Sequence, residues 1–201
     1  MRIVALVVSV LFHPMLMPTI WMFLVFNSGT HISFMPPEAR TILYTVIFTT
    51  TCGFPVAILP LLYQFKVIKS FEMKTARERF LPILLTSIFY YIGFVVLKKM
   101  GVPMMIQKFV IASLIAVMSA SIISFFWKIS IHMIGIGGVT GGMLALASHY
   151  DSGHINLWLL LLLMVAAITA SARLYLGAHN PTQVYTGYLW GTVVVAGTMC
   201  L

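Results

Sequence analysis

Acidic residues are scarce in this sequence. Only four of its 201 residues are Asp or Glu, and 8% are charged, against about 25% in an ordinary soluble domain. The four acidic residues are Glu38, Glu72, Glu78 and Asp151, and all of them lie outside the long apolar runs. Because those runs also hold no Cys and His pair at ligand spacing, the sequence gives almost no support to a metal site. We therefore expect neither a metal nor another cofactor.

Cysteines and membrane-embedded polar residues are also few. Cys52 and Cys200 both fall in apolar stretches, so we interpret them as small core residues that imply nothing about the redox compartment. Within the apolar runs there is little polarity beyond His13 and scattered Ser and Thr. A small transporter or channel needs polar residues along a path through the bilayer, and is therefore a minor alternative.

Apolar residues fill most of the chain, at 61% of the composition and a mean hydropathy of +1.04. No soluble core could bury that much apolar surface, whereas about 20 apolar residues cross a bilayer. The predicted spans are Ile3–Phe26, Thr41–Phe65, Phe80–Leu97, Phe109–Trp127, Ile131–Ser148, Asn156–Ala172 and Val184–Leu201. We expect a single transmembrane domain over residues 1–201. It is an all-α, polytopic integral membrane helical bundle with about six to seven transmembrane helices, located in a bacterial inner membrane.

The first apolar run is too long for a signal peptide and lacks a polar cleavage region, so we predict a membrane span. His13-Pro14 and Pro18 interrupt it. A histidine inside a span is a candidate functional residue. We favour the alternative that this segment is a packed, kinked helix.

The net charge of +8 would suggest a nucleic-acid partner in a soluble protein. Here the cations lie at predicted helix ends, where they meet lipid headgroups, so we expect membrane lipids and a lipid phosphate as partners and no nucleic acid. Span parity puts the N-terminus, residues 66–79, the turn at 127–130 and the turn at 177–183 on one side, which we call face X. Face X carries Arg2, Lys66, Lys69, Lys74, Arg77, Arg79, Lys128 and Arg173. The positive-inside rule would make face X cytoplasmic, but cations that hold phosphate would bias the count whichever way the protein faces.

The stretch ARLYLGAHNPTQVYTGYLWG, residues 172–191, carries the clearest chemistry. Arg173 is a natural bidentate phosphate ligand, and His179 can act as a nucleophile that takes up a phosphoryl group. Along one helix the two side chains would diverge, but Gly177 can end the first helix and let His179 double back. We therefore expect both residues at a helix–turn–helix junction on face X.

This stretch resembles the third signature of the type 2 phosphatidic acid phosphatase superfamily, SR, five residues, H, three residues, D. The resemblance implies that Arg173 binds phosphate, that His179 is the nucleophile and that Gln183 stands where an Asp orients the His. Ala172 replaces the usual Ser. A neutral Gln183 can accept from the ring without polarising it. It can also be structural, completing a capping box with Asn180.

The family's second signature, PSGH, supplies the general acid, and two histidines compete for that role. Ser152-Gly153-His154 matches the string, but a single span separates it from His179 and puts His154 on the opposite membrane face. His132 lies two spans before His179, so parity returns it to face X. We therefore assign His132 as the acid, with Ser130 in the phosphate-binding set, and interpret His154 as part of a solvated loop.

The first signature, K, six residues, RP, is loosely echoed by KTARERFLP, residues 74–82. Lys74 and Arg79 would add to the phosphate clamp, whereas the alternative is an ordinary basic loop. The resemblance thus covers about residues 74–191. Behind His132, the four-residue spacing of Gly138 and Gly142 predicts close helix packing.

Together these residues predict a hydrolase of lipid metabolism, a metal-independent lipid phosphatase that acts on a lipid phosphate or diphosphate through a phosphohistidine. The alternative is a catalytically impaired family member that binds lipid phosphate as an accessory membrane protein. The oligomeric state is not predicted by the sequence.

Overall fold

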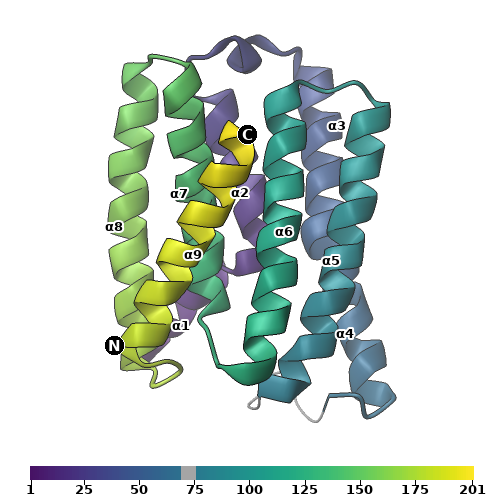
Figure 1. Cartoon of the computed structure of the whole chain (residues 1–201), viewed down its shortest axis with the longest axis vertical. Coiled ribbons are helices and arrows are strands. Elements are labelled where there is room, and N and C mark those ends of the chain that lie inside the picture. Colours follow the sequence, from purple (N-terminus) through teal and green to yellow (C-terminus); the bar gives the residue numbers. More distant parts are fainter. Residues whose placement is uncertain (69–75) are drawn as a thin grey trace.

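The protein is a bundle of long helices that run up and down between two faces (Figure 1). The computed structural model describes residues 1–68 and 76–201, and only the backbone of residues 76–79. Its described residues form helices and turns, with no strand among them. The α-helices are α1 (Arg2–Leu11), α2 (Met17–Phe26), α3 (Pro37–Phe48), α4 (Phe54–Gln64), α5 (Ala76–Lys99), α6 (Met104–Phe126), α7 (Ile131–His149), α8 (Gly153–Tyr175) and α9 (Pro181–Cys200).

Six helical segments in the described part of the chain are long and apolar enough to cross a membrane. They are Arg2–Phe26, Pro37–Gln64, Phe80–Lys99, Met104–Phe126, Ile131–His149 and Gly153–Tyr175. The outer surface is correspondingly apolar: on α8, Leu160, Leu163 and Met164 are each more than half exposed. Such a surface suits lipid and not water. The predicted all-α, polytopic membrane bundle is confirmed.

The predicted seventh span is present as α9 but is less apolar than the others. It does not count among the six candidate spans, because glycines and threonines take the place of large apolar residues along it. Figure 1 shows α9 running obliquely across the bundle from the face that carries the N-terminus toward the opposite face. Its 20 residues give it a length of about 30 Å at 1.5 Å per residue.

The first span is kinked, as predicted. Helix α1 ends at Leu11, the 3₁₀ turn η1 (Pro14–Leu16) follows, and α2 begins at Met17. Proline removes a backbone donor and fixes φ, so a helix cannot run straight through His13-Pro14.

The second span also contains an irregular turn, which the sequence did not predict. Between α3 and α4 the chain forms the π-helical turn η3 (Thr49–Gly53). The hydroxyl of Thr51 donates to the Met15 carbonyl at 3.3 Å and to the Ile47 carbonyl at 2.8 Å. The turn therefore places the Thr51 hydroxyl against the Met15 carbonyl, beside the kink of the first span.

Helices α7 and α9 meet backbone to backbone. A Cβ added at Gly137 or Gly141 of α7 would collide with the backbone of α9, and one at Gly191 of α9 would collide with that of α7. A Cβ at Gly187 would collide with the carbonyl of Ser130, the N-cap of α7. Close packing at Gly138 and Gly142 is confirmed, since a Cβ on Gly138 would lie 3.3 Å from the Val195 side chain of α9, but Gly137 and Gly141 approach the α9 backbone more closely. Gly142 instead makes room for Trp21 and Phe109, whose rings stack at 3.7 Å between centroids.

All the turns assigned to face X that the structure describes lie at one end of the bundle, the lower end in Figure 1. The N-terminus, the turn between α6 and α7 and the turn between α8 and α9 are found there, together with the end of α4 and the start of α5. The opposite end carries the α2–α3, α5–α6 and α7–α8 connections and the C-terminus.

Candidate functional site

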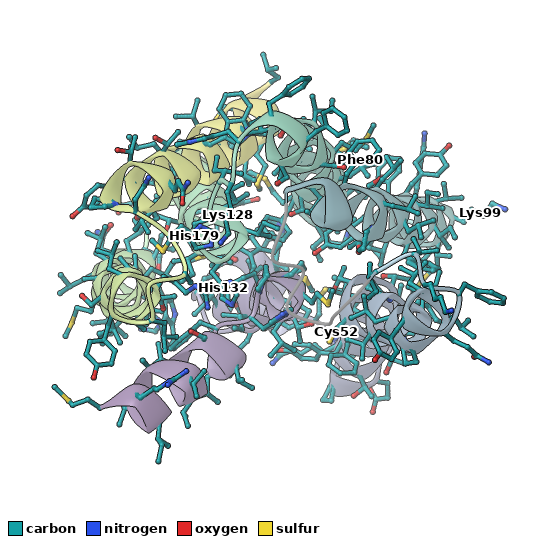
Figure 2. All side chains as sticks on the ribbon, turned by 90° about the horizontal axis from the view of Figure 1, so that it is seen from below. Cys52, Phe80, Lys99, Lys128, His132 and His179 are labelled. Atoms are coloured by element: carbon teal, nitrogen blue, oxygen red, sulfur yellow. The ribbon has the colours of Figure 1, made fainter. Side chains whose placement is uncertain are left out.

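Four of the polar side chains near face X line one cavity. Arg173 comes from the last turn of α8, His179 from the α8–α9 turn, His132 from the first turn of α7 and His13 from the kink of the first span. The cavity has a volume of about 350 Å³. Figure 2, seen from below, shows His132 and His179 close to Lys128, on the side of the bundle away from Lys99.

Glycine at position 177 creates the reversal that brings His179 back toward α8. Its φ of +62° is left-handed, which suits glycine. The Gly177 amide donates to the Leu174 carbonyl at 3.0 Å, and the Ala178 amide donates to the Arg173 carbonyl at 3.2 Å. These two bonds form a Schellman motif, and the predicted role of Gly177 as the helix stop is confirmed.

The ring of His179 is held through its Nδ1 atom, and the imidazole is about nine-tenths buried. Nδ1 lies 3.2 Å from the Lys128 carbonyl oxygen and 3.2 Å from Oε1 of Gln183. The same Oε1 accepts from the backbone N–H of Asn180 at 3.2 Å, which can only donate and so fixes the orientation of the amide. Two carbonyl oxygens at Nδ1 require a proton there, and neutral His179 then carries its lone pair on Nε2.

Gln183 therefore makes the contacts that both roles considered from the sequence require. It orients His179, and it completes a capping box in which its own backbone N–H donates to Oδ1 of Asn180 at 2.9 Å. Asn180 is the N-cap and Pro181 the first helical residue, as predicted. The turn between α6 and α7 is also bonded to Gln183, because the Ser130 amide donates to the Gln183 backbone carbonyl at 3.3 Å.

Ser130 itself is fully buried and is not among the residues that line the cavity. Its hydroxyl makes no hydrogen bond with any residue in the described part of the chain. Its backbone carbonyl faces α9 at the close approach of Gly187. The position joins α7 to α9, and the structure gives its hydroxyl no contact with the cavity where phosphate was expected.

A residue that the sequence did not indicate, Ser9 of α1, links His132 to Arg173. Nε2 of His132 donates to the Ser9 carbonyl at 3.1 Å, and Nη1 of Arg173 donates to the Ser9 hydroxyl at 3.3 Å. Ser9 is buried, and its hydroxyl also donates to the Ala5 carbonyl at 2.9 Å. Because Nε2 of His132 is engaged by a carbonyl, the nitrogen that remains for proton transfer is Nδ1.

Away from the polar groups, the cavity is bounded mainly by apolar side chains, among them Leu59, Ile83, Phe109, Val117 and Val139. Thr86, Tyr90 and Ser113 add isolated hydroxyls to the wall. The cavity is thus amphipathic, with cationic and imidazole groups near face X and hydrocarbon along the walls inside the bundle.

The predicted basic clamp is only partly described. Lys74 lies outside the described residues, and Arg79 falls in the first turn of α5, where only the backbone is described. Pro82 and Ile83, the next turn of α5, line the cavity. The start of α5 thus leads directly into the site.

The literal Ser-Gly-His string lies at the other end of the molecule. His154 is in the first turn of α8 and Arg173 in the last, 19 residues apart, which is about 28 Å along the helix. The Ser152 hydroxyl donates to the Ser28 carbonyl at 2.7 Å and so ties this end of α8 to the first span. The structure thus brings His132, and not His154, to the cavity of His179.

Chemically, the arrangement combines a guanidinium, three imidazoles and a hydrocarbon-lined space, which suits an amphiphile with an anionic head. No three His, Cys, Asp or Glu side chains gather at metal-binding distance in the described ranges. No family model, no curated protein and no solved structure matched this chain.

Proposed function

We propose that the protein is a lipid phosphatase that forms a phosphohistidine on His179. The observation that carries the proposal is the meeting of His179, Arg173 and His132 at the polar part of an apolar-walled cavity. The resemblance of residues 172–191 to the third phosphatidic acid phosphatase signature points to the same chemistry.

In the proposed complex the phosphate lies against Arg173 and the lipid chain enters the apolar part of the cavity. A guanidinium forms strong, charge-assisted hydrogen bonds with phosphate oxygens, and these bonds strengthen where water is excluded. Arg79, in the first turn of α5, and Lys74, which lies outside the described residues, would complete the clamp. Prenyl and glycerolipid phosphates or diphosphates all meet these requirements.

In the first step, Nε2 of His179 attacks phosphorus in line while the bond between phosphorus and the lipid oxygen breaks. Nδ1–H is shared by the Lys128 and Gln183 oxygens, which favours the tautomer that leaves Nε2 nucleophilic. This step requires His132 as the imidazolium, which keeps its Nε2–H on the Ser9 carbonyl and gives its Nδ1 proton to the departing lipid alkoxide.

In the second step, water attacks the phosphohistidine and passes a proton to His132. Inorganic phosphate leaves, and both histidines return to their starting forms. The products are a lipid alcohol and phosphate, and a diphosphate substrate would yield the lipid monophosphate and phosphate.

The test is phosphate release by the purified protein in detergent, with EDTA present, from prenyl and glycerolipid mono- and diphosphates. Parent protein should release phosphate and His179→Ala should not. His154→Ala is the matched control, because it removes an imidazole about 28 Å away along α8 and should leave the rate unchanged. No release from any lipid in the panel would refute the proposal.

A second candidate is a lipid-phosphate binding or accessory protein that has lost turnover. It is favoured by the neutral amide at His179, where Gln183 supplies no carboxylate and shares its oxygen with the helix cap. Binding of lipid phosphate without release, in the parent and in a variant with a carboxylate at position 183, would support this candidate.

The proposal also includes residence in a bacterial inner membrane. The fold establishes that the protein is a multi-pass membrane protein. Its location in the inner membrane is the proposed part. Fractionation of bacterial inner and outer membranes after expression, followed by detection of the protein, tests it.

A further inference from the structure

His13 has one of its two ring nitrogens fixed by the kink of the first span. It is the N-cap of η1, and its Nδ1 accepts from the backbone N–H of Met15 at 3.4 Å. A backbone N–H can only donate, so Nδ1 must carry the lone pair. Neutral His13 therefore has its hydrogen on Nε2, at the far edge of the ring.

That Nε2–H belongs to a residue of the cavity wall. His13 lines the same cavity as Arg173, His132 and His179, and its ring lies 5.4 Å from that of His132, nearly perpendicular to it. Within the described part of the chain, Nε2 of His13 donates to no protein group. A ligand oxygen in the cavity would give this donor an acceptor.

We propose that His13 is a further anion contact, a neutral donor that the first span adds to the phosphate site through Nε2. The inference rests on the proposed function for the identity of the ligand. A phosphate presents several acceptor oxygens, and Arg173 approaches from α8 while His132 and His179 approach from α7 and the α8–α9 turn. His13 comes from a fourth segment, so it can reach an oxygen that the other three leave exposed.

His13 also caps a turn, and the two roles can be separated by substitution. Asparagine is among the best N-cap residues, so His13→Asn retains an acceptor for the Met15 amide and loses the Nε2 donor. His13→Ala loses both. We expect the melting temperature of His13→Asn to stay close to that of the parent and that of His13→Ala to fall.

The experiment measures binding of hexylphosphonate, which cannot be hydrolysed at its carbon–phosphorus bond, and of hexanol, which has the same chain without the anion. His13→Asn should weaken hexylphosphonate binding by about tenfold, the scale of one hydrogen bond to a charged group, and leave hexanol binding unchanged. In ¹⁵N-histidine spectra the Nε2 signal missing from His13→Asn should shift in the parent when hexylphosphonate is added.

Parental phosphonate affinity in His13→Asn would overturn the inference, as would equal losses for hexylphosphonate and hexanol. Failure of the parent to bind hexylphosphonate would also overturn it. The readout is independent of turnover. If the parent binds hexylphosphonate through His13 but releases no phosphate from lipids, the inference stands and the phosphatase proposal fails.

Discussion

Gln183 uses one oxygen for two purposes. Its Oε1 accepts from Nδ1 of His179 and from the Asn180 amide, each at 3.2 Å, and an amide oxygen has two lone pairs with which to do so. Both distances exceed the usual 2.9–3.0 Å of an N–H···O bond. The histidine is thus oriented by a group that is also the second half of a helix cap, and that group carries no charge.

Adding a charge at position 183 should make His179 a stronger base. Gln183→Glu keeps the side-chain length and the capping box, and places a carboxylate beside Nδ1. An opposite charge at this distance should raise the pKa of His179, because it stabilises the imidazolium. Histidine NMR titration would measure this pKa in the parent and in the variant.

Phosphoryl transfer should also be faster in Gln183→Glu when both proteins are compared at a pH above the higher of the two His179 pKa values, where His179 is neutral in each. A Gln183→Glu variant with parental pKa would contradict the observed hydrogen bond.

Removing the amide tests orientation separately from stability. Gln183→Leu should destabilise the protein by about 1 kcal/mol, the scale of a lost cap, and should also abolish turnover. Asn180→Ala is the matched control, because it removes the other half of the cap and leaves the His179 acceptor in place. Equal activity losses in these two variants would show that Gln183 acts only through the helix.

The role of His132 should depend on the leaving group. A general acid matters in proportion to the basicity of the departing oxygen, so His132→Ala should slow release from lipid alcohol esters far more than release from p-nitrophenyl phosphate. His179→Ala should abolish both reactions, since the nucleophile is needed for every substrate. Steady-state rates on the two classes of ester test this role. Equal losses of rate in His132→Ala would argue against His132 as the general acid.

At the scale of the helices, the seam between α7 and α9 is set by glycine. Gly191→Ala would drive its Cβ into the backbone of α7 near Ile134 and Gly138, which cannot give way as a flexible side chain would. We expect a loss of about 1–3 kcal/mol, typical of overpacking, seen as a lower melting temperature in detergent. Gly197→Ala lies on the same helix with open space around it, and should be neutral or slightly stabilising. Similar melting temperatures for the two variants would contradict the close approach.

Local chemistry was enough to predict much of this architecture. Long apolar runs predicted the helices, His13-Pro14 predicted the kink, Gly177 the end of α8, and Asn180-Pro181 with Gln183 the start of α9. Each of these signals acts through residues within about one helical turn of the feature that it sets. The end of the bundle at which His132 lies could also be predicted, because counting spans needs no knowledge of helix packing.

What the sequence could not give depends on how helices are rotated against one another. Gly137 and Gly138 are adjacent, and only the orientation of α7 decides that a Cβ on Gly137 would meet the α9 backbone and one on Gly138 the side chain of Val195. Ser9 joins the site because α1 packs against α8, where Ser9 accepts from Arg173 and from His132 of α7, and nothing near Ser9 encodes that contact. The π turn at 49–53 had no distinctive local signal either, since a run of threonines is compatible with a regular helix.

Over the whole molecule, the polar part of the cavity and most of the positive charge lie at the same end of the bundle. The residues that line the cavity include Arg173 and three histidines near face X, where the sequence also concentrates its Lys and Arg. In a bundle that crosses the bilayer, a site at that end would lie at the level of lipid headgroups, and its apolar walls would extend into the hydrocarbon region. The opposite end carries His154, which the cavity does not include.

The last prediction concerns how this asymmetry is placed across the membrane. Thr182 and Asp151 are both exposed, the first beside His179 on face X and the second at the start of the α7–α8 connection on the opposite face. In a variant in which Cys52 and Cys200 are replaced by serine, a single cysteine at position 182 and one at position 151 should react with an impermeant maleimide from opposite sides of sealed vesicles. If the positive-inside rule governs this chain, position 182 is labelled from the cytoplasmic side, which inverted vesicles expose. The reverse orientation would mean that the cations of face X were retained for phosphate and did not set the topology. Labelling of both positions from the same side would contradict the span parity, and with it the choice of His132 over His154 as the partner of His179.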